Sequence, residues 1–366
     1  QGTFLLATLA ALGLRPVAGF LFAAEDDAAA SPKGSQSMKK MHVLLLCGGG
    51  GSEHEVSLRS ANFLEQQLGF LADVEVTRVE MFADRWLSAD GRECKLGLDR
   101  LLSFDSVARP VDFVVPCIHG YPGETGDLQS FLELAGLPYL GCDAEASKIC
   151  FNKISTKLWL SAINIPNTPY LFLTQQDESS LSEAKAALAK WGRVFIKAAC
   201  QGSSVGCYSA STETELVQSI KDAFGYSEQV LIEKAVKPRE LEVAVYQYGD
   251  ELVATYPGEI CVPTDKFYTY EEKYSSASHT ATSLKAEGLT QAQSEAIQAY
   301  ALKAFRQLKL THLSRIDFFL TEDGEILLNE INTFPGMTPI SMFPKLLEHH
   351  GHRFAQFLEG IVRKPA

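Results

Sequence analysis

Blocks of apolar and polar residues alternate along residues 41–142 and predict strands separated by helices. Apolar strands are expected at 42–47, 73–82, 111–120 and 138–142, and helices at 58–68 and 127–137. Strands that alternate with helices favour a parallel sheet, which binds ligands at the carboxyl ends of its strands. Two glycine turns, Gly48–Gly51 and His119-Gly120, lie at such ends.

The pattern beyond residue 142 predicts two further units. A helix is expected over 144–163, where "NIPNTP" ends it, and strands at 193–198 and 206–210 flank the loop "CQGSSVG". A third unit is expected to begin near "QVLIEKAV" and to continue through 239–260. It contains a long non-periodic loop, 261–280, and loops of that length inside enzymes are usually functional lids or disordered. The expected domains are 38–142, 143–232 and 233–366.

The first 37 residues differ from the rest. The stretch "TFLLATLAALGLRPVAGFLFAA" resembles a leader, but Arg15 and Pro16 interrupt it, and no basic segment precedes it. We expect it to lie outside the fold, either as an over-extended start upstream of Met38 or Met41 or as a targeting or anchoring segment. No other stretch is long enough to span a bilayer.

Composition narrows the class of protein. The chain has 366 residues, of which 46% are hydrophobic and 21% charged, as expected for an enzyme of two or three domains. A net charge of -12 with scattered basic residues argues against nucleic-acid binding and favours small-molecule partners. The eight cysteines include no C-x-x-C pair, which favours buried, reduced thiols in the cytosol over a zinc site.

The first glycine turn, "CGGGGSEHE", leads from a strand into a helix. Its glycines let a ligand approach the backbone, and a helix N-terminus favours anions. A dinucleotide fingerprint would need a third glycine where Glu53 stands, and the Gly-Lys-Ser/Thr of a P-loop is absent. A carboxylate beside glycine amides suits a small zwitterion, whose ammonium group would face Glu53.

A second local pattern is the hairpin "LSRIDFFLTEDGEILLNEIN". If Asp323-Gly324 forms a two-residue type I′ turn, Asp317 lies opposite Glu330 and Arg315 opposite Asn332, all on one face. Directly opposed acids repel unless they are neutralised. Oxygen ligands of this kind suit Mg²⁺ together with water and phosphate oxygens. A solvated acidic edge is the alternative, although it leaves Arg315 and Asn332 unexplained, and a one-residue bulge would change the register.

Three lysines add to this pattern. Lys197 lies in the middle of the strand "VFIKAAC", where burying a cation is costly unless it is paired or bound to a ligand. Lys153 is on the helix "FNKISTK", and Lys273 is in the long loop. Each alone reads as a surface lysine. Together with the glycine-serine loop and the oxygen ligands, they indicate clamps on a triphosphate.

From about Met41 onward the chain resembles D-alanine–D-alanine ligases of the ATP-grasp superfamily. The resemblance rests on an ordered set of motifs: "GGGGSEHEVSL", "HGYPGETGDLQSFLELAGLPYLG", "GSSVG", "LIEK", "FYTYEEKY", "SRIDFFL" and "NEINTFPGMTPISMFPK". It implies a three-domain α/β ATP-grasp architecture with an N-terminal parallel-sheet (preATP-grasp) domain. It also implies cytoplasmic, ATP-dependent ligation of two D-alanines through an acyl phosphate for peptidoglycan synthesis. Mg²⁺, as two ions and replaceable by Mn²⁺, and a homodimer are expected with it.

The resemblance also assigns roles to residues. Glu53 would pair with the ammonium of the first D-alanine, with Ser203 and Tyr274 as its hydrogen-bonding partners and His119 near the substrate carboxylate. The remaining expected contacts are with phosphate (Lys153, Lys197 and Lys273), with adenine and ribose (Glu233, Lys234 and Glu240), with metal (Asp317, Glu330 and Asn332), with the oxyanion (Arg315 and the Gly336 amide) and with the second carboxylate (Ser341 and the Met342 backbone).

Departures from the family pattern and alternative functions stay open. Thr125 stands where the family often has aspartate, and Ala198 replaces the commoner proline, but neither departure removes a charged role that the resemblance assigns. A D-alanine–D-lactate or D-alanine–D-serine ligase is an alternative that Tyr274 and the neutral Met342 disfavour. A non-catalytic nucleotide-binding regulator is another, which the intact Asp317, Glu330, Asn332, Arg315 and Lys273 disfavour.

Overall fold

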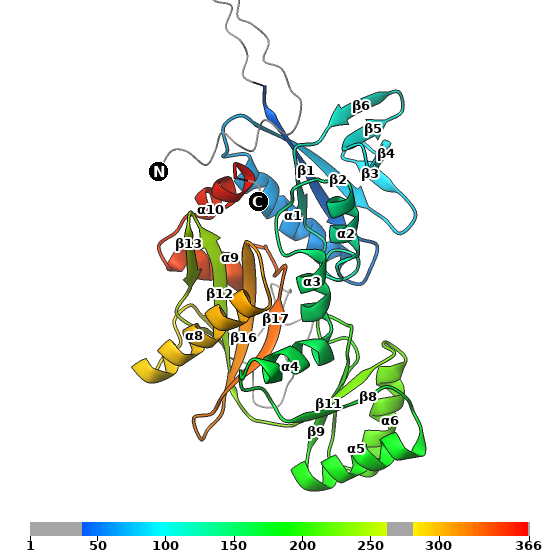
Figure 1. The fold of residues 1–366 in the computed structure, drawn as a ribbon, viewed down its shortest axis with the longest axis vertical. Coiled ribbons are helices and arrows are strands. Elements are labelled where there is room, and N and C mark those ends of the chain that lie inside the picture. The colour runs from blue at the N-terminus through cyan, green and yellow to red at the C-terminus, as the bar shows by residue number, and fades with distance from the viewer. Residues whose placement is uncertain (1–38, 262–280, 365–366) are drawn as a thin grey trace, which may run out of the picture. The chain divides into compact units, whose positions relative to one another are not determined.

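The computed structural model describes residues 39–261 and 281–364, which belong to one compact unit, Lys39–Ala366. Three β-sheets with flanking helices make up this unit (Figure 1). The leader at 1–37 and the predicted site residues Lys273 and Tyr274 lie outside the described residues.

The first sheet has the strand order β6-β5-β4-β3-β2-β1-β7. β1 (Met41–Gly48) pairs in parallel with β2 (Val74–Met81) and β7 (Phe113–Pro116), as predicted. The other four strands form an antiparallel meander that the sequence pattern did not predict: β3 (Trp86–Ser88), β4 (Glu93–Leu96), β5 (Leu101–Phe104) and β6 (Val107–Pro110). Each is only three or four residues long, too short for a clear period. The predicted strand at 138–142 is a single bridge between Tyr139 and Val114.

Two helices follow the glycine turns and pack on opposite faces of the first sheet. α1 (His54–Leu68) follows β1 after the first glycine turn and begins earlier than predicted, so Glu53 occupies its N-cap position. α2 (Asp127–Leu134) follows the second glycine turn. Leu64 of α1 is buried with Val43 and Leu45 of β1, whereas Leu128 of α2 belongs to the cluster on the opposite face of the sheet. The glycine turns are therefore held between packed elements.

The second sheet is antiparallel, with the order β10-β9-β11-β8. Its strands are β8 (Tyr170–Leu173), β9 (Val194–Ala198), β10 (Cys207–Ala210) and β11 (Val230–Lys234), and α5 (Glu178–Trp191) and α6 (Glu213–Phe224) pack against it. The run 229–236 had been expected to open the third unit. That expectation is wrong, because β11 pairs with β8 and β9. The second sheet therefore continues past residue 232 to Lys234.

The third sheet contains β12 (Arg239–Tyr248), β13 (Glu251–Ala254), β14 (Gly258–Cys261), β15 (Ala281–Ser283), β16 (Leu313–Leu320) and β17 (Ile326–Asn332). One face carries Val243 and Ile316 and packs against α8 (Gln291–Gln307). The other carries Tyr246 and packs against α9 (Met342–His349) and α10 (Phe354–Val362). The buried residues on the Tyr246 face form one cluster with residues of β1 and α1. One continuous core therefore joins the first and third sheets.

The single helix predicted over 144–163 is two helices, α3 (Ala144–Phe151) and α4 (Lys153–Ala162). Asn152 separates them with an extended backbone, and its Oδ1 accepts hydrogen bonds from the N–H groups of Ile154 (3.0 Å) and Ser155 (3.1 Å). Asparagine is a preferred N-cap because its side chain satisfies these otherwise unpaired donors. The break makes Lys153 the first residue of α4.

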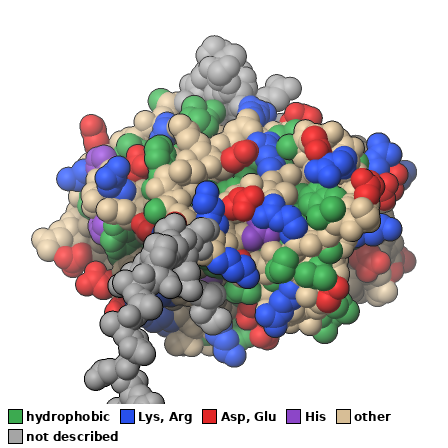
Figure 2. Space-filling view, turned by 90° about the horizontal axis from the view of Figure 1, so that it is seen from above, with side chains coloured by type: hydrophobic (Ala, Val, Ile, Leu, Met, Phe, Trp, Pro, Cys, Tyr) green, Lys and Arg blue, Asp and Glu red, His purple; other side chains and the backbone are tan. Residues whose placement is uncertain are grey.

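Acidic and basic side chains are interspersed on the face shown in Figure 2, as the scattered charges of the sequence suggest. Five of the eight free cysteines are buried, whereas Cys200 and Cys261 are exposed and Cys207 is intermediate. Within residues 39–261 and 281–364, no helix combines the length and apolar content needed to cross a membrane.

Candidate active site

A cavity brings together predicted site residues from strands, helices and loops that are distant in the sequence. Its lining includes ten of them: Glu53, His119, Lys153, Ser203, Arg315, Glu330, Asn332, Gly336, Ser341 and Met342. Asp317 accepts hydrogen bonds from two of the lining residues, Arg315 and Asn332. Lys197, Glu233, Lys234 and Glu240 lie outside it. Ten predicted residues from distant parts of the sequence thus lie around one cavity.

Glu53 is buried at the start of α1, with 8% of its surface exposed. The Ser203 hydroxyl, from the loop after β9, donates a hydrogen bond to Glu53 Oε1. Two glycines make room for the carboxylate: a Cβ at Gly120 would lie 2.9 Å from Glu53 Oε2, and one at Gly202 would lie 3.1 Å from it. The turn at Gly120 and the loop at Gly202 therefore both contact the Glu53 carboxylate.

His119 is held by a chain of hydrogen bonds. Its Nδ1–H donates to the Phe334 carbonyl (3.2 Å), and its Nε2 is 2.7 Å from Ser60 Oγ, which also accepts from the Met337 N–H (3.1 Å). Burial lowers the pKa of His119, but the Glu124 carboxylate, 3.6 Å from Nδ1, and Glu53 outweigh burial, so the pKa is raised. The imidazole is fixed between the first sheet and the segment after β17.

The hairpin between β16 and β17 has the predicted register at the site. Asp317 pairs with Glu330 and Arg315 with Asn332. The predicted two-residue type I′ turn is wrong. Thr321 and Glu325 pair around a three-residue loop, and Gly324 adopts φ +86° while Asp323 has no positive φ. A bulge between Asp317 and Phe318 adds one residue on β17 and restores the expected pairs.

Three carboxylates form one row across neighbouring strands, because Glu242 of β12 pairs with Asp317, which pairs with Glu330. Arg315 makes a two-fold contact with Asp317, Nε to Oδ1 and Nη2 to Oδ2 at 2.8 Å each, and its Nε lies 3.4 Å from Glu242 Oε2. Asn332 Nδ2 donates to Asp317 Oδ2 at 3.0 Å. These hydrogen bonds and the guanidinium charge offset the repulsion within the row.

Asp317, Glu330 and Asn332 offer only oxygen ligands besides the Asn332 amide nitrogen, and such a set fits Mg²⁺. In this structure the Asp317 oxygens contact Arg315 and Asn332. Among residues 39–261 and 281–364, no three His, Cys, Asp or Glu side chains are grouped so that they could hold a metal ion. Ligand oxygens from a bound phosphate would have to complete the set.

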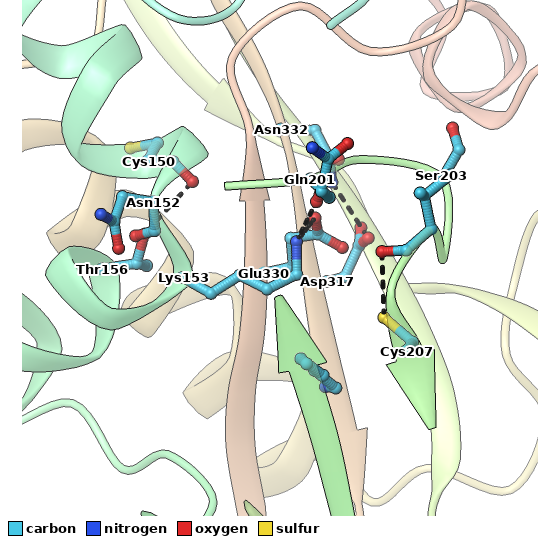
Figure 3. Close-up of polar contacts among 12 residues, drawn as sticks. Cys150, Asn152, Lys153, Thr156, Gln201, Ser203, Cys207, Asp317, Glu330 and Asn332 are labelled. Atoms are coloured by element: carbon cyan, nitrogen blue, oxygen red, sulfur yellow. Dashed lines mark hydrogen bonds and ion pairs between the residues drawn. The ribbon is translucent and has the colours of Figure 1, made fainter. Parts of the chain in front are cut away.

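Lys153 points from α4 toward this row (Figure 3). Its Nζ donates to the Gln201 carbonyl at 2.6 Å and lies 3.7 Å from Glu330 Oε1. Its backbone N–H also bonds the Ala199 carbonyl (2.9 Å), which fixes the start of α4 beside the loop after β9. Lys153 therefore links that loop to the acidic row.

Glu233 is predicted to contact the nucleotide base and ribose, and in this structure its carboxylate is held by two lysines. Lys197 Nζ lies 2.6 Å from Oε1, and Lys157 Nζ lies 2.8 Å from Oε2. Burial would raise the pKa of Glu233, but the two ammonium groups outweigh burial and lower it to about 2. Lys234 is exposed, and Glu240 is partly buried on β12, where it pairs with Phe319.

The segment after β17 forms the remaining wall. Gly336 is buried, and Ser341 Oγ accepts a hydrogen bond from the Thr338 N–H (3.0 Å). Ser341 is the N-cap of α9 but makes no side-chain cap bond, and Met342 is buried at the first helical position. The N-terminal end of α9 therefore faces the cavity with backbone donors that suit an anion.

Three residues of the site were missed from the sequence. Glu242 is a buried carboxylate and Glu124 a partly buried one, and both line the cavity, while Lys157 is buried beside Glu233. For Lys157 a signal existed, because it follows Lys153 by one helical turn. Glu242 stands in the middle of an apolar strand, where a carboxylate is costly without a partner.

Comparisons with known proteins show which family the chain is similar to. Residues 42–142 match the family model described as D-ala D-ala ligase N-terminus, and 159–363 match D-ala D-ala ligase C-terminus. A D-alanine--D-alanine ligase of Aeromonas salmonicida is 90% identical over 90% of this chain and all of that protein. The crystal structure of D-alanyl-alanine synthetase A from Vibrio cholerae has a TM-score of 0.86 at 58% identity, covering 90% of this chain and 99% of that one. A D-alanine-D-alanine ligase from Aeromonas hydrophila has a TM-score of 0.78 at 81% identity, covering 88% and 100%.

Proposed function

The chain belongs to the D-alanine–D-alanine ligase family, which has the ATP-grasp fold, and we propose that it joins two D-alanine molecules into D-alanyl-D-alanine with hydrolysis of ATP to ADP and phosphate. The observation that carries this proposal is the convergence of Glu53, Ser203 and Arg315 on one cavity. A buried carboxylate there suits an ammonium group, and the guanidinium suits an oxyanion.

The first half of the reaction needs one carboxylate to be activated. We propose that Glu53, oriented by Ser203, holds the ammonium of the first D-alanine, and that His119 lies near its carboxylate. An oxygen of that carboxylate attacks the γ-phosphorus of ATP, and ADP leaves, so D-alanyl phosphate forms. Lys153 and Lys197 offset the charge of the phosphate oxygens, which is the main demand of phosphoryl transfer.

The second half forms the peptide bond. The amine of the second D-alanine attacks the acyl carbon, a tetrahedral oxyanion develops, and phosphate leaves as the amine gives up its proton. Arg315 and the Gly336 N–H are the proposed oxyanion donors, and Ser341 with the Met342 N–H would bind the second carboxylate. Holding the three reactants together removes much of the entropic barrier.

Asp317, Glu330 and Asn332 would hold Mg²⁺, as two ions and replaceable by Mn²⁺, and the metal would supply charge neutralisation at the phosphates. Lys273 and Tyr274 are proposed to contact the phosphates and Glu53, and Lys234 and Glu240 the nucleotide, as the family resemblance implies. The product would serve peptidoglycan synthesis in the cytoplasm, which the eight free cysteines favour. A homodimer is proposed and is tested by sedimentation.

Phosphate release from ATP tests the proposal when it is measured with Mg²⁺ and D-alanine, L-alanine, D-serine or D-lactate as the added substrate. We expect release with D-alanine, equal in amount to the dipeptide detected by mass spectrometry, and little with L-alanine. A mixture of D-alanine and D-lactate that gives mainly the ester would instead identify the depsipeptide ligase. No D-alanine-dependent release would refute ligase activity.

A further inference from the structure

Lys157, Glu233 and Lys197 form a triad of three linked charges, of which Lys157 and Glu233 are buried. Lys157 comes from α4, Glu233 from β11 and Lys197 from β9. The two ion pairs are 2.8 Å and 2.6 Å long, and the side chains of Lys157 and Glu233 are 3% and 4% exposed. Lys197, at 19%, is the more exposed of the two lysines. The triad therefore has a buried, closed end at Lys157 and a more exposed, open end at Lys197.

The net charge of this triad decides how strongly Lys197 attracts an anion. A carboxylate paired with one lysine is neutral, so an isolated Glu233–Lys197 pair would attract an incoming anion only weakly. The second lysine gives the group a net charge of +1. Because Glu233 gives one oxygen to each lysine, its contact with Lys157 remains when Lys197 turns toward another anion.

We propose that Lys157 is a positioning residue for nucleotide binding: it compensates Glu233 from the closed end, so that the ammonium of Lys197 is available to a nucleotide phosphate. This inference rests on the proposed function, in which Lys197 binds ATP. Lys157 touches no phosphate itself. Its effect passes through Glu233.

The surroundings of Lys157 fit a fixed charge. Its Nζ lies 4.9 Å from the centre of the Tyr170 ring, and Tyr170 of β8 pairs directly with Glu233. An aromatic face stabilises a buried cation without neutralising it. Burial lowers the pKa of Lys157, whereas Glu233 favours its charged form. The contacts with Tyr170 and Glu233 hold this ammonium at the closed end.

The test measures ADP affinity by calorimetry in the full chain with Mg²⁺ present, so that no turnover occurs. Lys157→Met removes the charge and keeps the length of the side chain, and we expect ADP to bind at least tenfold more weakly. Lys157→Arg should restore binding to within threefold of the parent. The D-alanine concentration for half-maximal rate should change less than twofold in both variants. Lys157→Gln serves in place of Lys157→Met if the latter does not fold.

A double variant separates charge from packing. Lys157→Met with Glu233→Gln leaves Lys197 as the only charge, so the net charge of +1 returns, and we expect most of the lost ADP affinity to return with it. Lys190→Met, an exposed lysine on α5, is the matched control for loss of one positive charge.

Unchanged ADP affinity in folded Lys157→Met, or a double variant as weak as the single one, would overturn the inference. A parent chain that binds ADP and makes dipeptide leaves the proposed function standing in either case. A parent that does not bind ADP would refute both.

Discussion

The Ser203 hydroxyl donates a hydrogen bond to Glu53, although 150 positions separate the two residues in the sequence. Glu53 belongs to the first glycine turn and Ser203 to the loop after β9, so this bond links the carboxylate proposed to bind substrate to a second structural unit. Ser203 reaches it with φ +50°, an uncommon conformation for a residue other than glycine. Its position is therefore determined by the site rather than by local preference.

Replacing Ser203 with glycine should weaken D-alanine binding without harming the fold. Glycine accepts a positive φ at no steric cost and removes only the hydroxyl. A hydrogen bond to a charged group contributes about 1.5–3 kcal/mol, which corresponds to a loss of roughly tenfold or more. The measurement is the D-alanine concentration for half-maximal phosphate release in Ser203→Gly.

Ser204→Gly is a close control, because Ser204 also has a positive φ (+64°) but is exposed. It relieves the same kind of backbone strain and retains the Ser203 hydroxyl. We expect near-parent saturation by D-alanine. If the two variants were equally impaired, loop conformation rather than the Glu53 contact would account for the loss.

Glu330→Gln should separate stability from activity. Directly opposed like charges destabilise a strand pair, so removing the charge opposite Asp317 should leave the thermal midpoint without ligand equal or slightly higher. Phosphate release should fall at least about 100-fold, since the negative charge of a proposed metal ligand and the ion-pair partner of Lys153 are lost.

Glu322→Gln, on the exposed loop of the same hairpin, provides the control and should behave as the parent does. A titration with Mg²⁺ is part of the measurement, and Glu330→Gln should need more metal for its residual rate. Near-normal release at ordinary Mg²⁺ concentration would remove Glu330 from the metal site.

The acidic hairpin shows why some of the site was predictable. Alternation along a strand placed Arg315, Asp317 and Glu330 correctly, because side chains on one face follow a period of two. The turn was mispredicted, since Asp-Gly fits both a two-residue turn and the last positions of a three-residue loop. The bulge on β17 cancelled that error. The sequence pattern predicts which face of a strand a side chain lies on, but it does not predict where a β-bulge adds a residue to one of two paired strands.

Gly324→Ala tests the three-residue loop. The glycine has φ +86°, and a Cβ there would meet only Gln293 Nε2 at 3.9 Å, so the cost comes from the backbone and not from a clash. We expect a loss of about 1 kcal/mol in unfolding free energy with unchanged activity. Gly324→Asn should cost less, because asparagine tolerates this region better. Equal stability of Gly324→Ala and the parent would contradict the assigned turn.

Interactions between distant segments were the least predictable part. Nothing in "QVLIEKAV" indicates that its strand pairs with β8 and β9, because its apolar run fits either sheet. The buried ion pair of Lys157 and Glu233 depends on that pairing. By contrast, the break at Asn152 was readable, because asparagine before a new turn is a capping signal. Tertiary pairing, rather than local propensity, placed these charges.

His312 provides a test of pH dependence. It is 8% exposed, has φ +65°, and its Nδ1 accepts a hydrogen bond from the Gly141 N–H at 3.0 Å. Burial lowers its pKa from 6.5 to about 4. The unfolded chain therefore binds this proton at a higher pH than the folded chain does, so stability falls as the pH drops from about 6.5 to about 4 and changes no further below that.

His312→Asn should remove this pH dependence. Asparagine tolerates a positive φ, and its amide oxygen can accept the Gly141 hydrogen bond without titrating. A pKa difference of this size corresponds to about 3 kcal/mol at most. Thermal midpoints of parent and variant, measured at pH 7.5, 5.5 and 4.5, should diverge on acidification, with the parent losing more. Parallel midpoints across this range would mean that His312 takes up its proton equally in both states, and the Gly141 bond would then not require a neutral imidazole.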